Sequence, residues 1–500
     1  MFLTLIENLH SHARKNPGAI AIRQIIPENK QTTTWEALRD RAAALSKKLS
    51  AALPDGAVVM LCSANRAEFT AAFLGVLSAG MHVFPIATDI ASPELSSAAG
   101  RSGAVALICI GQPALAAGNV FSRRREMPEC APDALFYDLP AFPSRTFDGP
   151  GLLLLSSGTT GRPKIVRRDG GSLDAVSRNM VDAIGFSAPD IVLAAVPLCH
   201  SYGMEHGLLC PIWAGSTTHL YDRFDLPAAL AELSAGSVTV FPGVPFMFET
   251  LAGGAGDAPL GPLKLRRAYS AGGALPRSLF DAFAAKFGVS IAQLYGATEI
   301  GSVCFNDPAI VPFDPASVGR AMQDVSIRIL DAGHPDIARP LPSGVEGHVA
   351  IAGPSMLAEY VDGDPPELLA GHFLTGDLGR RDESGALTIT GRIKLLIDVA
   401  GRKVNPLEVE QVMRSHPTVG DCVVVPLRVS QTLCRLRAVV TPARPDEIPT
   451  VADLRQFARA HLSAYKVPRI FEIRASLPRS AAGKILRNVV ENETAETDQG

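Results

Sequence analysis

The sequence predicts an α/β fold with a large, layered N-terminal domain and a small α+β domain at the C-terminal end. Short apolar runs alternate with helix-like segments up to about residue 392, which is typical of parallel sheets covered by helices. Beyond that point the pattern changes to that of a small α+β unit. A chain of 500 residues is also too long for one compact core. We expect a domain over 1–391, a hinge at 392–395, a domain over 396–490 and a disordered acidic tail at 491–500.

The expected strands of the large domain are short apolar runs bounded by turn-prone residues. They are Val58–Leu61, Val83–Ile86, Val105–Ile110, Leu152–Leu155, Val192–Val196 and Val238–Phe241. The expected helices include an amphipathic one through Leu5 and Leu9, followed by Arg66–Ser78 and Ala228–Leu233. In the small domain, Leu407–Met413 and Val451–His461 read as helices, and Cys422–Pro426 and Leu436–Val440 read as strands.

Composition narrows the class of protein. The 47 basic and 50 acidic residues nearly cancel in charge. No strong electrostatic field therefore favours binding to nucleic acid or to an anionic membrane. Eight cysteines are scattered without a CxxC pair, so neither a zinc site nor a disulfide framework is indicated. The N-terminus lacks the basic region of a signal peptide, and the long uncharged stretch Phe69–Thr88 is interrupted by polar residues, as suits a buried helix and strand. We expect a cytoplasmic enzyme without a membrane span.

A loop after the buried run Leu152–Leu155 carries four hydroxyls, two glycines and two basic residues. It reads Ser156-Ser157-Gly158-Thr159-Thr160-Gly161-Arg162-Pro163-Lys164. Such a loop offers donors to an anion without bulky side chains, and it suits a polyphosphate. The P-loop of nucleotide hydrolases is excluded, because the two glycines are only three apart and no Gly-Lys-Ser/Thr follows. A solvated Ser/Thr/Gly turn is the plainer alternative.

This loop and four later segments, in this order, resemble the motifs of the class I adenylate-forming superfamily. That superfamily includes acyl- and aryl-CoA synthetases, peptide-synthetase adenylation domains and firefly luciferase. The segments are Tyr295-Gly296-Ala297-Thr298-Glu299, Thr375-Gly376-Asp377 with Gly391-Arg392-Ile393-Lys394, Gly401–Glu410 and Ser480–Ile485. Weaker similarity reaches Ala64–Phe69, so the resemblance covers nearly the whole chain. Within the superfamily, the chain is most similar to an acyl-CoA synthetase.

The resemblance implies attack of a carboxylate on the α-phosphate of ATP, giving an acyl-adenylate and pyrophosphate. The loop Ser156, Ser157, Gly158, Thr159, Thr160, Gly161 and Lys164 would bind the β- and γ-phosphates. Thr298 would contact the α-phosphate, Glu299 would bind Mg²⁺, and Tyr295 would stack on adenine. Asp377 would accept hydrogen bonds from the ribose hydroxyls, with Arg392 beside it. Taken alone, Glu299 reads as a helix-start residue and Asp377 as a turn residue.

Lys484 would be the catalytic lysine, bridging the carboxylate and the α-phosphate during adenylation. Taken alone it would be an ordinary exposed lysine. The resemblance further implies a mobile C-terminal domain that rotates about Lys394 between the two half-reactions. Gly401 would line the tunnel for a pantetheine thiol, where a side chain would block the path.

The acid pocket is expected around the stretch Pro197–Met204. His200 matches a histidine that lies near the carboxylate in related ligases, although a lone histidine is more often structural. Tyr202, Phe246, Gly272 and Gly273 would line the pocket. Amino-acid-activating relatives usually carry an aspartate here, and this stretch has none, although Glu205 lies nearby. An uncharged acyl or aryl acid is therefore expected.

The thiol acceptor and the oligomeric state stay open. Coenzyme A is the first expectation, and the phosphopantetheine arm of an acyl carrier protein is the alternative, because both use the same chemistry. The adenylate itself being the end product is a third possibility. An inactive, ligand-binding relative is a further alternative, because Ile165, Asp169-Gly170 and Gly347-His348 depart from the family pattern. None of these departures removes a group that the chemistry requires.

Overall fold

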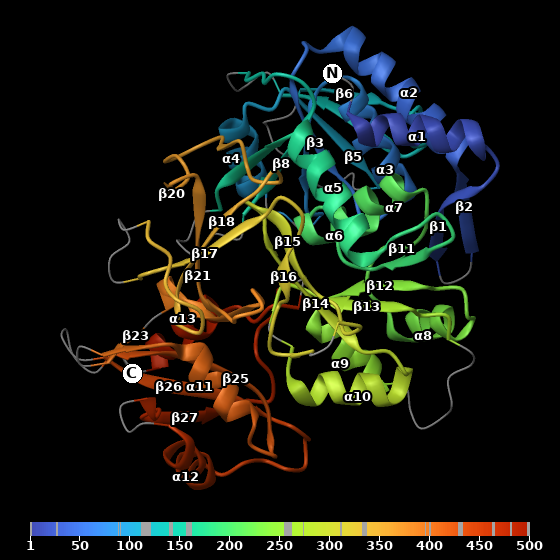
Figure 1. Cartoon of the computed structure of the whole chain (residues 1–500). Helices are drawn as coiled ribbons and strands as arrows, with labels where there is room; N and C mark the ends of the chain where they lie inside the picture. The colour runs from blue at the N-terminus through green and yellow to red at the C-terminus, as the bar shows by residue number, and fades with distance from the viewer. Residues whose placement is uncertain are drawn as a thin grey trace. The chain divides into compact units, whose positions relative to one another are not determined.

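The computed structural model describes residues 3–497 apart from 27–28, 89, 91, 112–121, 140–143, 157–162, 255–262, 274, 311–312, 333–337, 396, 400–401, 429–433, 463–465 and 481–482. The chain divides into two compact units, and each is described by itself (Figure 1). The first unit comprises residues 1–326 and 351–373, and the second comprises 327–350 and 374–500. The domain and hinge boundaries expected from the sequence stay predictions.

Within the described residues, the first unit holds a nine-stranded sheet in the order β16-β15-β14-β13-β12-β10-β11-β1-β2. The run from β14 to β1 is parallel, and antiparallel strands cover both edges. The bounds are β1 Ile20–Ile26, β2 Asn29–Thr34, β10 Ile191–Ala194, β11 Thr217–Tyr221, β12 Val240–Gly243, β13 Arg267–Ser270, β14 Ile291–Ala297, β15 Gly301–Asn306 and β16 Arg320–Ala321.

The second sheet of this unit has eight described strands in the order β19-β9-β8-β4-β3-β5-β7-β6. Its centre, β8-β4-β3-β5, is parallel, and the flanking strands are antiparallel. The bounds are β3 Val58–Cys62, β4 His82–Ile86, β5 Ala106–Ile110, β6 Ser122–Glu126, β7 Ala134–Asp138, β8 Gly151–Leu155, β9 Ile165–Asp169 and β19 Glu359–Tyr360. The strands β3, β4 and β5 are buried along their whole length because helices cover both faces.

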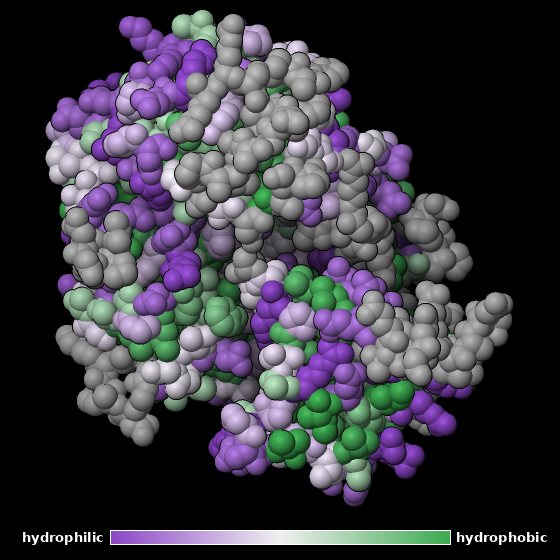
Figure 2. All heavy atoms as spheres, turned by 180° about the vertical axis from the view of Figure 1, so that it is seen from behind, coloured by the Kyte–Doolittle hydropathy of each residue, from purple (hydrophilic) through white to green (hydrophobic). Residues whose placement is uncertain are grey.

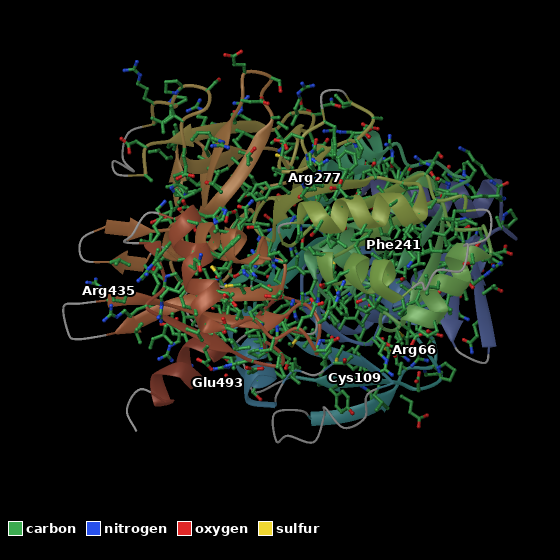
Figure 3. All side chains as sticks on the ribbon, turned by 90° about the horizontal axis from the view of Figure 1, so that it is seen from below. Arg66, Cys109, Phe241, Arg277, Arg435 and Glu493 are labelled. Atoms are coloured by element: carbon green, nitrogen blue, oxygen red, sulfur yellow. The ribbon has the colours of Figure 1, made fainter. Side chains whose placement is uncertain are left out.

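Helices of the first unit pack in three layers around these sheets (Figure 1). Helices α1 (Thr4–Lys15), α2 (Trp35–Ala52), α3 (Ala67–Ser78), α5 (Gly170–Ile184) and α7 (Cys210–Ala214) share one core with facing strands of both sheets. Helices α8 (Leu226–Ser234), α9 (Pro245–Gly254) and α10 (Arg277–Phe287) cover the other face of the nine-stranded sheet, and α4 (Ser92–Ser102) lies on the outer face of the second. Phe241 of β12 meets this outer layer, with its ring 5.1 Å from that of Phe248 (Figure 3).

Side-chain caps fix where several of these helices begin. Thr34 accepts from the amide of Ala37, and Asp169 accepts from the amide of Ser172 at 2.8 Å. These oxygens satisfy amide groups that have no partner inside the helix. Asp169 thus has a structural role at the position where the sequence departs from the family pattern.

Most of a five-stranded sheet belongs to the second unit, whereas its short strand β20 belongs to the first. Its described order is β17-β18-β21-β20, with β22 also paired to β21. The bounds are β17 Ser326–Leu330, β18 Gly347–Ala352, β20 Leu368–Leu369, β21 His372–Arg381 and β22 Leu387–Arg392. A single turn, η3 (Ile393–Leu395), and a short hairpin of β23 (Ile397–Val399) and β24 (Arg402–Val404) follow.

The rest of the second unit is the small α+β part. A sheet of β25 (Val419–Arg428), β26 (Cys434–Pro442) and β27 (Ile470–Ile473) packs with α11 (Pro406–Arg414) and α12 (Val451–His461) around one core. Helix α11 begins at Asn405, whose side chain accepts from the amide of Leu407 and donates to the carbonyl of Thr390 at 2.7 Å. The fold class and the expected helices and strands are confirmed, with ends that differ by a few residues.

The expectation of a disordered tail is wrong for residues 491–497, because helix α13 spans Arg487–Thr497. The acidic composition predicted disorder, yet Val490 is fully buried beside Val423 and Leu477. Glu493, which is labelled in Figure 3, also pairs with Arg474 at 2.5 Å. Val490 and this ion pair therefore anchor the helix, although the composition of the tail is polar.

None of the described helices is long and apolar enough to cross a membrane. On the face shown in Figure 2, hydrophilic side chains are interspersed with apolar ones.

Candidate active site

The ends of the phosphate loop lie on adjacent antiparallel strands. Ser156 follows β8 and Lys164 precedes β9, and the amide of Ser156 donates to the carbonyl of Lys164 at 2.9 Å. In return the amide of Lys164 donates to the Ser156 hydroxyl at 3.2 Å. These two bonds close the base of the loop. The predicted phosphate-binding residues Ser157, Gly158, Thr159, Thr160 and Gly161 lie outside the described residues.

A short strap from Ser355 to Asp362 lies beside β9, at the end of the loop that carries Lys164. Its strand β19 pairs with β9, so that Tyr360 lies opposite Val166. The Asp362 carboxylate accepts from the amide of Ile165 at 3.0 Å, and Arg101 of α4 pairs with Asp362 and donates to the Pro163 carbonyl. Ile165 is fully buried. The strap therefore fixes the arm of the loop that carries Lys164.

Tyr360 joins Lys164 to Glu299. The Lys164 ammonium lies 4.2 Å from the centre of the Tyr360 ring, and the Tyr360 hydroxyl donates to Glu299 Oε1 at 3.2 Å. Sequence reasoning missed Tyr360, because it lies far from both partners along the chain. The expected phosphate-binding lysine and the expected metal-binding carboxylate are thus brought together by one side chain.

Thr298 and Glu299 occupy the turn between β14 and β15, and both side chains are half-buried. The turn is tight: Gly301 has a φ of 67°, and a Cβ at Gly296 would lie 2.4 Å from the Gly301 carbonyl oxygen. The strap holds this turn as well, because the amide of Leu357 donates to the Glu299 carbonyl at 2.7 Å. Tyr295 lies at the end of β14 and is half-buried.

Whether this turn suits Mg²⁺ depends on the carboxylates around Glu299. Among the described residues, no group of three or more His, Cys, Asp or Glu side chains is arranged to hold a metal ion. Mg²⁺ is commonly held by one or two carboxylates together with substrate phosphates and water. A single half-buried carboxylate beside a phosphate loop fits that mode, so Glu299 is suited to contact a phosphate-bound cation.

The predicted acid-pocket residues follow the carboxyl ends of neighbouring parallel strands. Strands β10, β12, β13 and β14 run in parallel, and Gly243 pairs with Ser270, which in turn pairs with Gln293. The segments that follow these four strands contain, in order, His200, Phe246, Gly272 with Gly273, and Thr298 with Glu299. Ligands of open α/β sheets bind at this edge.

His200 begins helix α6 (Ser201–Met204) and is exposed. Buried Asn65 fixes the segment that leads to it, donating to the Val196 carbonyl at 3.0 Å and accepting from the Leu198 amide at 2.7 Å. Tyr202 is anchored to the strand ends, because its hydroxyl donates to the carbonyls of Gly243 at 3.0 Å and Tyr269 at 3.2 Å. Burial raises the pKa of Tyr202, which keeps that hydroxyl a donor.

Other predicted wall residues are more open. Phe246 is 39% exposed, and its ring lies edge-on to that of Phe224 at 6.0 Å. Gly272 adopts a φ of 83°, which favours glycine, and Gly273 is exposed.

A buried ion pair lies behind this wall. Glu205 begins the π-helical turn η2 (Glu205–Leu209), and its Oε1 accepts from Arg168 at 2.6 Å and from Ser201 at 2.9 Å. Its Oε2 accepts from the hydroxyl of Ser302 at 2.6 Å. Burial alone would raise the pKa of Glu205, but Arg168 holds it below the ordinary value. The carboxylate that the sequence placed near the pocket is therefore neutralised inside the protein.

His206 extends this network to the strand ends. Its Nδ1 lies 2.8 Å from the Tyr269 hydroxyl, and its Nε2 lies 3.3 Å from Ser302 Oγ. Because Ser302 donates its proton to Glu205, it accepts from His206, which assigns the imidazole proton to Nε2. Burial lowers the pKa of His206 to about 4, so the ring is neutral at neutral pH.

The second unit brings together three other predicted residues. Asp377 of β21 pairs in register with Arg392 of β22, and Arg392 Nε lies 2.6 Å from Asp377 Oδ1. Asp377 is buried. The Lys484 residue is exposed, but neighbouring protein atoms desolvate its ammonium, which lowers the pKa of this lysine. The charge of Arg392 lowers that pKa further, and the charge of Asp377 raises it. All three side chains therefore act within one electrostatic environment.

Backbone turns hold the Asp377 and Lys484 segments in shape. Gly376 has a φ of 75°, and its amide donates to His348 Nε2 at 2.9 Å, so His348 has a defined structural contact at its departure from the family pattern. The amide of Ser480 donates to the Lys484 carbonyl at 2.8 Å. The predicted hinge residue Lys394 lies in η3, and only its backbone is described. The predicted tunnel residue Gly401 lies outside the described residues.

Comparison with known proteins places the chain among the AMP-binding enzymes. It is 31% identical over 350 residues to "Probable CoA ligase CCL9" of Humulus lupulus, a match that covers 68% of this chain and 65% of that protein. It is 29% identical over 510 residues to "Fatty acid--[acyl-carrier-protein] ligase ScoC" of Streptomyces coeruleorubidus, covering 97% and 95%. The fold is similar to that of ATP-bound MatB from Rhodopseudomonas palustris, with a TM-score of 0.85, 24% identity and coverage of 99% of this chain and 100% of that chain.

Two domain families match the chain. The AMP-binding enzyme C-terminal domain matches residues 408–484, and the AMP-binding enzyme domain matches residues 9–361. The larger match covers more than half of the chain and contains both ends of the phosphate loop, the Thr298–Glu299 turn and the strap up to Val361. The chain belongs to the AMP-binding enzyme family.

Proposed function

We propose that this chain is an ATP-dependent acid–thiol ligase. A carboxylate attacks the α-phosphate of ATP to form an acyl-adenylate and pyrophosphate, and a thiol then displaces AMP to form a thioester. The observation that carries the proposal is the joining of Lys164 and Glu299 through Tyr360 at the base of the phosphate loop. A cation for phosphate and a carboxylate for Mg²⁺ are the two charges that ATP–Mg²⁺ requires at one place.

Each predicted residue has a role in the first half-reaction. Lys164 and its loop bind the outer phosphates, Thr298 contacts the α-phosphate, and Tyr295 packs on adenine. Asp377 accepts from the ribose hydroxyls while Arg392 orients its carboxylate. Lys484 bridges the incoming carboxylate and the α-phosphate. Both reactants are anions, so charge neutralisation and alignment supply most of the rate enhancement.

The acid is an uncharged acyl or aryl acid. An amino acid would need a free carboxylate near its ammonium, and the nearby Glu205 is committed to Arg168 inside the protein. A small apolar wall of Tyr202, Phe246, Gly272 and Gly273 suits an apolar or aromatic chain. His200, exposed at the start of α6, lies beside the carboxylate of the acid.

Coenzyme A is the proposed acceptor, and an acyl carrier protein is the alternative. One relative bears the name of a CoA ligase and another that of a carrier-protein ligase, so the comparisons support both. For either acceptor, rotation about Lys394 and a tunnel at Gly401 would admit the thiol.

An acid panel tests the function. We expect pyrophosphate release from ATP and Mg²⁺ that depends on an acyl or aryl acid, and thioester formation when coenzyme A or a phosphopantetheinylated carrier is added. Amino acids should give no release. Absence of acid-dependent release across the panel, with ATP still bound, would favour a ligand-binding relative without activity.

A further inference from the structure

Tyr360 makes two contacts with opposite charges through different parts of one side chain. Its ring face lies beneath the Lys164 ammonium at 4.2 Å, and its hydroxyl donates to Glu299 Oε1 at 3.2 Å. A ring face attracts cations, and a hydroxyl donates to carboxylates. One tyrosine therefore satisfies both groups at the same time.

The backbone leaves Tyr360 little freedom. Strand β19 pairs with β9 on one side of it, where the amide of Val361 donates to the Ile165 carbonyl at 2.8 Å. On its other side, the amide of Leu357 donates to the Glu299 carbonyl at 2.7 Å. The strap thus binds the loop arm and the Thr298–Glu299 turn at once, with Tyr360 between these two attachments.

The hydroxyl of Tyr360 has one proton, and the geometry directs it to the carboxylate of Glu299. The hydroxyl orients the Glu299 carboxylate through its contact with Oε1.

We propose that Tyr360 is a positioning residue that holds Lys164 and Glu299 in the arrangement required by the ATP–Mg²⁺ complex. This inference rests on the proposed function. It assigns the two contacts separate consequences: the hydroxyl governs the response to Mg²⁺ through Glu299, and the ring governs the affinity for the nucleotide itself through Lys164.

Two substitutions separate these consequences. Tyr360→Phe keeps the ring and removes the hydroxyl, whereas Tyr360→Leu removes both. The matched control is Tyr221→Phe, which removes a buried hydroxyl that donates to the Ala228 carbonyl at 3.1 Å, away from the phosphate loop. Thermal unfolding of all three variants shows whether each is folded.

The direct measurement is calorimetric binding of a non-hydrolysable ATP analogue, with EDTA and over a Mg²⁺ titration. We expect Tyr360→Phe to bind like wild type in EDTA, and to need about tenfold more Mg²⁺ for the cation-dependent gain in affinity. Tyr360→Leu should also bind several-fold more weakly in EDTA. Tyr221→Phe should match wild type in both conditions.

The two failures are distinguishable. If the wild-type chain binds the analogue but Tyr360→Phe shows an unchanged Mg²⁺ titration, the positioning role is overturned while the proposed function stands. Equal binding of Tyr360→Leu and wild type in EDTA would overturn the role of the ring. If the wild-type chain itself binds no nucleotide with or without Mg²⁺, the proposed function fails, and the inference fails with it.

Discussion

Arg392 Nε lies 2.6 Å from Asp377 Oδ1, across a registered pair of positions on β21 and β22. The Asp377 side chain is 4% exposed and that of Arg392 is 41% exposed, so the carboxylate is held from the solvent side by a cation. The same two charges act in opposite directions on Lys484. This grouping links the expected ribose-binding residue to the expected catalytic lysine within one unit.

Replacing Asp377 by Asn should weaken ATP use. The amide keeps the size of the side chain, but it loses the ion pair with Arg392 and offers only one acceptor oxygen to the ribose. We expect the KM for ATP to rise roughly ten- to hundredfold, as for a lost charged hydrogen bond, with the KM for the acid little changed. Initial rates of pyrophosphate release measure both constants, and an unchanged KM for ATP would remove Asp377 from the ribose site.

Breaking the buried ion pair should cost stability rather than change the substrate class. Glu205→Gln leaves Arg168 charged in the interior with a neutral partner, and removal of one partner from a buried pair costs about 3–5 kcal/mol. Denaturant unfolding measures this loss. The double variant Arg168→Met with Glu205→Gln also removes the unpaired buried charge of Arg168. This variant should therefore recover a large part of the lost free energy of unfolding. A Glu205→Gln protein as stable as wild type would contradict the assignment.

The stability of the fold should fall between neutral pH and about pH 4, partly through His82. Neither ring nitrogen of this fully buried histidine has a hydrogen-bond partner among the described residues, and burial lowers its pKa from 6.5 to about 4. The unfolded chain therefore binds a proton first as the pH falls below 6.5. The stabilisation from the neutral ring is complete above pH 6.5 and is lost on the way to pH 4, a change of roughly 3 kcal/mol.

His82→Met provides the comparison for this pH effect. Methionine is apolar, flexible and cannot be protonated, so it should fill the site without the titration. We expect a smaller fall in the free energy of unfolding from pH 7 to pH 4 than in wild type, measured by denaturant titration at each pH. Identical pH slopes for the two proteins would show that His82 does not contribute.

The short buried strands could be predicted from the sequence, because their pattern depends on residues that are close together along the chain. The runs that became β3, β5 and β8 are apolar throughout, because helices cover both faces of their sheet, and such runs are visible in the sequence. Ordered motifs similarly indicated Ser156, Lys164, Thr298, Glu299, Asp377, Arg392 and Lys484. The structure then placed Asp377, Arg392 and Lys484 in one electrostatic environment.

Long-range pairing was not predictable in this way. Tyr360 is 61 residues from Glu299, and Arg168 is 37 residues from Glu205. Arg168 follows a second arginine in a strand, which suggests an exposed position, yet the side chain is fully buried because Glu205 meets it. At helix α13 the polar, acidic composition led to a prediction of disorder, and the apolar anchor Val490 was given too little weight.

Acid-dependent pyrophosphate release by Lys484→Ala is the most direct test of the proposed chemistry. Lys466→Ala is the matched control, because it removes another lysine of the same unit, paired with Glu408 at 2.6 Å. With an acid that wild type accepts, we expect Lys484→Ala to lose at least about a hundredfold in rate while still binding ATP, and Lys466→Ala to stay close to wild type. Release by Lys484→Ala at the wild-type rate would contradict the proposed role of this lysine in adenylation.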